Sequence, residues 1–129
     1  MKDLETEADI AFLLDRFYAR VRQHPELGPI FDGVAQVNWP EHLPKIQRFW
    51  SGLLFGTHAY EGNPILVHLR LARQTPISPI HFDQWLSLFG QTLTEHFEGE
   101  RASEALLRAR AIAAVMQNKL HQFGLLQTS

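Results

Sequence analysis

Apolar side chains recur at the spacing of an α-helix along nearly the whole chain, and this periodicity restricts the possible folds more than any other feature. Ile10, Leu13, Leu14, Phe17 and Val21 follow one another by one, three or four residues and share one face of a helix. No segment alternates for long between apolar and polar residues, as a half-buried strand would. The pattern therefore predicts an all-α chain.

Capping residues and prolines divide this pattern into helices. Thr6, with Asp9 three residues on, predicts a capped start for the first helix, and Asn38 predicts the start of the second. Pro44 removes a backbone donor near the second turn of that helix, so we expect a distorted or late start. We interpret residues 27–31 as a tight apolar turn. The expected helices span about Glu7–Gln23, Trp39–Phe55, Pro64–Leu71, Pro79–Phe97 and Ala102–Phe123. Such a pattern predicts two packed helical hairpins in a single domain, residues 1–129.

Composition excludes several classes of function. The chain has 129 residues and a net charge of -2, so it has no basic excess that would hold a nucleic acid. Cysteine is absent, which rules out disulfides, thiolate metal ligands and covalent haem attachment. The charged N-terminus does not resemble a signal peptide, and no apolar run approaches the ~18 residues of a membrane span. We therefore expect a cytoplasmic protein that binds neither nucleic acid nor membrane.

The seven histidines offer one kind of metal site. Their spacing provides neither local zinc-ligand pairs nor Glu-x-x-His motifs for a di-iron centre. Haem supplies four nitrogen ligands itself and needs only one axial histidine. His68, flanked by Leu66, Val67 and Leu69, has an apolar setting that suits a porphyrin edge. From the motif alone, a simple hydrogen-bonded buried histidine remains open.

Four segments in order carry a resemblance to a known family. They are FYARVRQHPELGPIF at residues 17–31, WPEHLPKIQRFWSGLL at 39–54, YEGNPILVHLRL at 60–71 and FDQWLSLF at 82–89. Together they resemble the group III truncated haemoglobins over nearly the whole chain. The Gly-Gly loop pairs typical of the other two truncated groups are absent.

The resemblance implies a truncated globin fold, with two helical hairpins crossed over a b-type haem. His68 matches the proximal iron ligand. Tyr18, His42 and Trp85 match three polar residues on the opposite, distal side, and Ile46 matches an apolar distal position. Tyr18 and Trp85 could instead serve packing alone, and His42 could swing to solvent as a gate. The prolines on either side of His42 depart from the family pattern and could turn it away from the iron.

The remaining candidate residues form the wall of the pocket and its charged rim. We expect Phe31 and Phe49 at the wall, within an aromatic set that is part pocket and part core: Phe31, Phe49, Trp50, Phe55, Phe82 and Phe89. Cations near the pocket segments could bind the haem carboxylates or be ordinary solvated charges. They are Lys45, Arg48, Arg70 and Arg73.

The function implied by the resemblance is the binding of O2 and other diatomic ligands, such as NO and CO. Three distal donors should slow the release of O2, which favours ligand scavenging or redox chemistry over oxygen delivery. One alternative is a redox enzyme, an NO dioxygenase or peroxidase-like protein. It would need a separate reductase, because the chain has no flavin or nicotinamide motif. Another alternative is a haem-free helical interaction module. For each of these functions we expect the protein to be a monomer.

Overall fold

The computed structural model describes residues 1–56 and 70–127, and over these ranges the chain is helical, as the periodicity predicts. The helices are α1 (Glu7–Gln23), the short π-helix η1 (Pro29–Val34), α2 (Trp39–Phe55), α4 (Pro79–His96) and α5 (Glu100–Gln122). Residues 70–74 are also helical. The described residues form no strand, and their one β-bridge joins Ile77 to Leu126. None of the helices in these ranges is long and apolar enough to cross a membrane.

The capping box predicted for α1 is present. The Thr6 hydroxyl accepts from the Asp9 backbone N–H at 3.2 Å, and the Asp9 carboxylate accepts from the Thr6 backbone N–H at 3.0 Å. Two of the orphan donors at this helix end are therefore satisfied by side chains three residues away. Because both bonds join residues that are close in the sequence, the start of α1 could be predicted from the sequence.

Helix α2 spans Trp39–Phe55, the range expected from the sequence. Of the distorted or late start expected from Pro44, the late start is therefore wrong. Asn38 caps it, with its side chain accepting from the Glu41 N–H. Pro44 lies inside the helix and cannot donate to the carbonyl of Pro40. Both prolines are exposed, so water can hydrate that carbonyl in place of the missing bond.

The segment after α1 is a π-helix and not a tight turn. The Ala35 N–H donates to the Ile30 carbonyl at 2.9 Å, a bond that spans five residues. Gly28 precedes it, where a Cβ would stand 2.4 Å from the carbonyl oxygen of Arg22. Only glycine fits such a close approach of two backbone segments.

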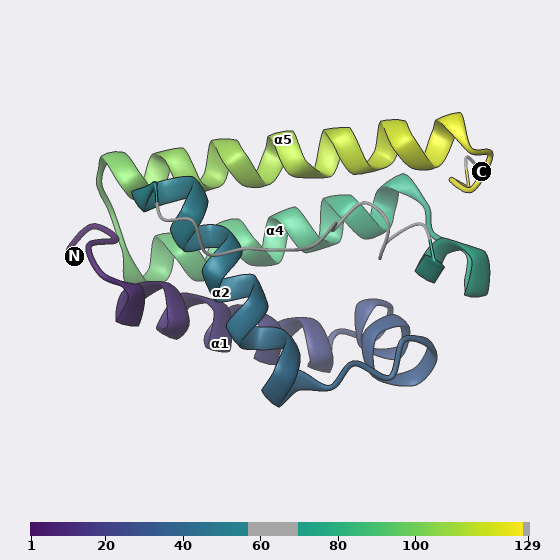
Figure 1. The fold of residues 1–129 in the computed structure, drawn as a ribbon, viewed down its shortest axis with the longest axis horizontal. Coiled ribbons are helices and arrows are strands. Elements are labelled where there is room, and N and C mark those ends of the chain that lie inside the picture. Colours follow the sequence, from purple (N-terminus) through teal and green to yellow (C-terminus); the bar gives the residue numbers. More distant parts are fainter. Residues whose placement is uncertain (57–69, 128–129) are drawn as a thin grey trace.

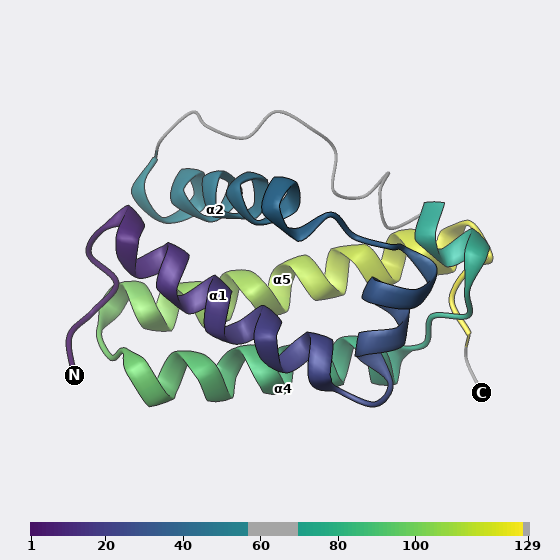
Figure 2. The same ribbon diagram turned by 90° about the horizontal axis from the view of Figure 1, so that it is seen from below.

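Two helical hairpins pack across one another, as expected. Helices α4 and α5 run side by side in opposite directions along the molecule (Figure 1). Helix α1 packs on α2 and α4, and α2 crosses obliquely to reach α5. Turned by 90°, the molecule shows α2 on one side and α4 on the other (Figure 2). The cavity described below lies between them.

The start of α5 is capped by a residue from the other end of the chain. The residue before this helix is Gly99, which has no side chain to offer and has a φ of +141°. The Asp3 carboxylate accepts instead from the N–H groups of Arg101, at 3.0 Å, and Ala102, at 2.8 Å. Partial burial raises the pKa of Asp3, but these bonds and one from Leu4 outweigh it, so the pKa lies below its usual value.

We expect Asp3→Ala to lower the free energy of unfolding by about 1 kcal/mol at neutral pH, because α5 loses its cap. A carboxylate with a lowered pKa stabilises the fold above its unfolded pKa, and this contribution disappears as the pH falls through its folded pKa. Urea unfolding of both proteins at neutral pH and at about pH 3 measures the difference. An equal difference at both pH values would contradict the charged cap.

Candidate functional site

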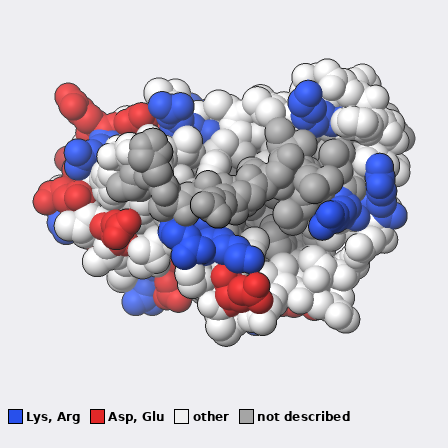
Figure 3. Space-filling model, viewed as in Figure 1, with Lys and Arg blue, Asp and Glu red and all other residues white. Residues whose placement is uncertain are grey.

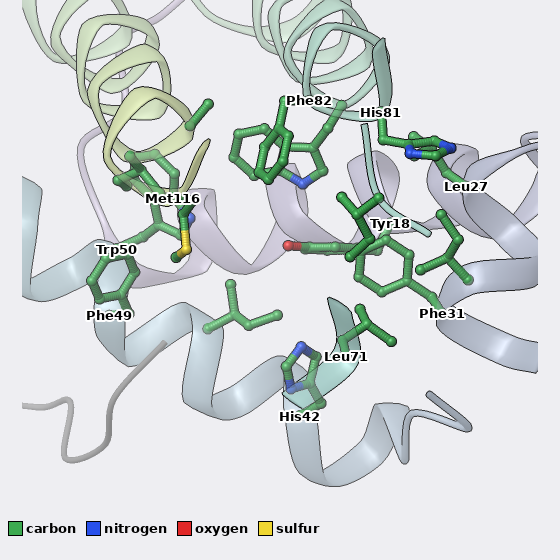
Figure 4. A pocket seen from close by; sticks show the side chains of 16 residues that line it. Tyr18, Leu27, Phe31, His42, Phe49, Trp50, Leu71, His81, Phe82 and Met116 are labelled. Atoms are coloured by element: carbon green, nitrogen blue, oxygen red, sulfur yellow. The ribbon is translucent and has the colours of Figure 1, made fainter. Parts of the chain in front are cut away.

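A cavity lined mainly by apolar side chains opens between α2 and the α4–α5 hairpin. Its volume is about 160 Å³, roughly ten times the ~10–15 Å³ that a single water requires. The described residues that line it come from α1, the η1 region, α2, residues 71–77, α4 and α5. They are Tyr18, Leu27, Ile30, Phe31, His42, Ile46, Phe49, Trp50, Leu71, Ile77, His81, Phe82, Trp85, Ile112, Ala113 and Met116 (Figure 4).

Tyr18 reaches into this cavity from α1 with its hydroxyl group (Figure 4). The side chain is buried, and burial raises the pKa of its phenol to about 12, although a hydrogen bond with Trp85 acts in the opposite direction. An indole can only donate, so the Tyr18 oxygen accepts from Trp85. The hydroxyl hydrogen of Tyr18 therefore remains available to donate to a molecule in the cavity.

His42 and Ile46 face the same cavity from α2, one turn apart. In Figure 4, His42 stands across the cavity from His81 and Phe82, which belong to α4. Its ring centroid lies 5.7 Å from that of Trp39, with the two planes at 75°. The structure thus brings together Tyr18, His42 and Trp85, three polar residues that lie far apart in the sequence.

The aromatic set divides between the cavity and the core. Phe31, Phe49, Trp50 and Phe82 line the cavity. Phe89 is completely buried beneath it and stacks on Trp50, with centroids 5.2 Å apart. The Phe55 ring lies outside the lining, under the guanidinium of Arg101 at 4.9 Å.

Comparison with known proteins places this arrangement in a family. A family model described as bacterial-like globin matches residues 3–118. The chain belongs to the bacterial-like globins. It is 38% identical over 121 residues to the group 3 truncated haemoglobin ctb of Campylobacter jejuni, covering 92% of this chain and 93% of that protein. The crystal structure of a group III truncated haemoglobin from Campylobacter jejuni superposes with a TM-score of 0.82 at 35% identity, covering 95% of this chain and 98% of that chain. Among the bacterial-like globins, the chain is a group III truncated haemoglobin, an all-α protein that binds haem and, through it, a gas.

The cavity of this globin suits a haem. Apolar side chains line it from three helices, with Ile46 and Phe49 on α2, Phe82 on α4 and Met116 on α5, so a flat apolar ring would meet mainly apolar side chains. Few polar groups interrupt this lining, and Tyr18 can donate a hydrogen bond into it. The donor set therefore matches a ligand that carries partial negative charge.

His81 lines the cavity of the globin, although the sequence analysis did not select it. Its Nδ1 accepts the Ser78 backbone N–H at 3.0 Å in the box that caps α4. The neutral ring therefore carries its proton on Nε2. The spacing Ser78-x-x-His81 predicts a helix cap, but nothing in it indicates that the ring also borders a cavity.

The remaining predicted residues lie outside the cavity or outside the described part of the globin. His68 falls in residues 57–69, which the structure does not describe. Arg70 and Arg73 are exposed, as are Lys45 and Arg48. Lys45 pairs with Glu41 at 3.3 Å. Basic side chains lie over α2 and near residues 70–74 on the face shown in Figure 3. None of the four lines the cavity.

The raised pKa of Tyr18 gives the globin a defined response to alkali. Above about pH 10 the unfolded chain loses a phenolic proton that the folded chain keeps to about pH 12, so stability must fall in this window. Between about pH 9 and about pH 11 this contribution amounts to about 1.4 kcal/mol. We expect Tyr18→Phe to lose less stability than the wild type over this interval, as measured by urea unfolding.

Proposed function

We propose that this globin binds O2, NO and CO on a b-type haem whose iron is ligated by His68. The observation that carries the proposal is the Tyr18 hydroxyl, which projects into a mainly apolar cavity with its hydrogen available to donate. The absence of cysteine excludes attachment of the haem through thioether bonds, which supports the b-type. The haem iron, when bound, supplies the position at which the gas attaches.

His68 is the histidine that matches the family's proximal segment. In the predicted helix at 64–71, it shares a face with Leu71, three residues later. Leu71 lines the cavity, which supports iron ligation by the histidine three residues before it in the chain. His42 and His81 also border the cavity but lie across from each other on α2 and α4. Variants of His42 and His81 therefore serve as comparisons when the assignment of His68 as the iron ligand is tested.

The distal donors favour a tightly held ligand. Bound O2 carries partial negative charge, and a hydrogen bond to a charged group is worth about 1.5–3 kcal/mol. The Trp85 N–H bonded to the Tyr18 oxygen polarises the hydroxyl and strengthens it as a donor. Slow release suits ligand scavenging, or redox chemistry on the ligand, better than oxygen delivery. Repeated redox turnover would require a separate reductase, because the chain has no flavin or nicotinamide motif.

The visible absorption spectrum tests the haem and its ligand. The purified globin should show a strong haem band that shifts on reduction and again under CO. We expect His68→Ala to lose haem or to change this band, because the iron loses its axial histidine. His121→Ala, on the exposed end of α5, is the control and should leave the spectrum unchanged. A normal spectrum in His68→Ala, with a changed one in His42→Ala or His81→Ala, would transfer the ligand role to that residue.

The rate of O2 dissociation tests the distal donors. Loss of a hydrogen bond worth at least 1.4 kcal/mol speeds release tenfold, so we expect Tyr18→Phe to release O2 about tenfold faster or more. Trp85→Phe should act in the same direction. Since the two side chains form one hydrogen-bonded unit, the double variant should be little faster than Tyr18→Phe alone. Stopped-flow displacement of O2 by CO gives the rates, and unchanged rates in both single variants would refute the donor role.

A further inference from the structure

Trp39 packs against His42 and forms a partly buried hydrogen bond with Asp32. It is the first residue of α2, and its side chain is 7% exposed although it does not line the cavity. Its indole Nε1–H donates to Oδ1 of Asp32 on η1 at 2.7 Å. A charged acceptor makes this bond roughly twice as strong as one between neutral groups.

Arg22, in the last turn of α1, completes the contact. Its Nε donates to Oδ2 of the same Asp32 carboxylate at 3.1 Å, and its guanidinium carbon lies 5.1 Å from the Trp39 ring centroid. The hydrogen bond from Trp39 contributes most to a pKa of Asp32 below its usual value, with Arg22 adding to it against partial desolvation. One carboxylate thus joins the end of α1 and the π-helix η1 to the start of α2.

The start of α2 needs such an anchor. The first N–H groups of any helix lack intrahelical partners, and Pro44 removes one further backbone bond from the opening turns. A helix end held this weakly is prone to open locally. His42 lies three residues after Trp39, within these turns, and its ring stands edge-to-face with the indole at 5.7 Å. Any movement of Trp39 would therefore move His42.

Tyr18 is held differently. It lies in the middle of α1, packs on Phe17 with centroids 4.6 Å apart, and bonds with Trp85. It also contacts Trp39 at 5.3 Å, but the contacts with Phe17 and Trp85 persist without that ring. Loss of the Asp32–Trp39 contact should therefore disturb the first turn of α2, which carries His42, and leave Tyr18 in place.

We propose that Asp32 and Trp39 are positioning residues, which fix the His42 imidazole at the ligand side of the cavity by anchoring the first turn of α2. The inference rests on the proposed function, since it assigns two residues that support the same site from outside the cavity. Asp32 and Trp39 touch no ligand themselves and act only through the position of His42.

The C–O stretching band of the reduced globin under CO reports the polar groups near the bound gas and tests this proposal. We expect Asp32→Leu to shift or split the band, because His42 then occupies more than one position. Trp39→Phe keeps a ring beside His42 but loses the donor, and should give the same change. Asp32→Asn keeps an acceptor for the indole and should retain the wild-type band, which separates the hydrogen bond from the ion pair with Arg22.

Two further variants show whether the effect passes through His42. On a His42→Leu background, Asp32→Leu should cause no additional change in the band. Glu95→Leu is the matched control, because Glu95 is also an exposed carboxylate that pairs with an arginine of α1, Arg20. It should leave the band unchanged. Circular dichroism and thermal unfolding confirm that each variant is folded.

The outcomes separate this inference from the proposed function. If His42→Leu alters the band but Asp32→Leu and Trp39→Phe do not, the positioning role is refuted and the proposed function stands. A shift from Asp32→Leu that persists without His42, or an equal shift from Glu95→Leu, refutes it as well. If neither Tyr18→Phe nor His42→Leu changes the band, the distal assignment itself fails, and this inference fails with it.

Discussion

Phe89 lies fully buried where three helices meet, and the rest of the site is built over it. Its ring stacks on Trp50 of α2, with planes at 16°, and on Trp85 of α4, with planes at 11° and centroids 5.8 Å apart. Phe17 of α1 packs edge-to-face with Phe89, with ring centroids 5.2 Å apart. Stacked and edge-to-face rings at these distances bury large apolar areas and allow few alternative packings. They hold α1, α2 and α4 at fixed separations, which leaves a cavity beside them.

This rigid base determines which polar groups can reach the cavity. Tyr18 follows Phe17 directly in α1, so the packing of one ring on Phe89 places the other at the cavity. Trp85 presents its ring to the stack and its N–H to Tyr18. Both residues thus join the core and the site, and their orientation is set by packing. His42, by contrast, belongs to the opening turns of a helix that contains Pro44, and its ring contacts Trp39 in these same turns.

The places where the sequence analysis was wrong or incomplete share one cause. Asn38 was identified as a cap, but the bond from Trp39 to Asp32 was not foreseen, and α2 was expected to have a distorted or late start. The π-helix at Pro29–Val34 was interpreted as a turn, since its five-residue hydrogen bonds have no distinct sequence pattern. His81 was not recognised as a cavity residue. In each case the deciding partner lies on another element or in an unusual backbone geometry.

The sequence by itself determined the helical class, the start of α1 and the family resemblance that pointed to Tyr18, His42 and Trp85. These depend on interactions within a few residues, such as the reciprocal bonds between Thr6 and Asp9, and on residue order. Only the tertiary structure decided that Asp3 caps a helix 98 residues away, or which aromatic rings face the cavity and which support it. Periodicity shows that a side chain is buried but not what it meets there, because that depends on how the helices cross.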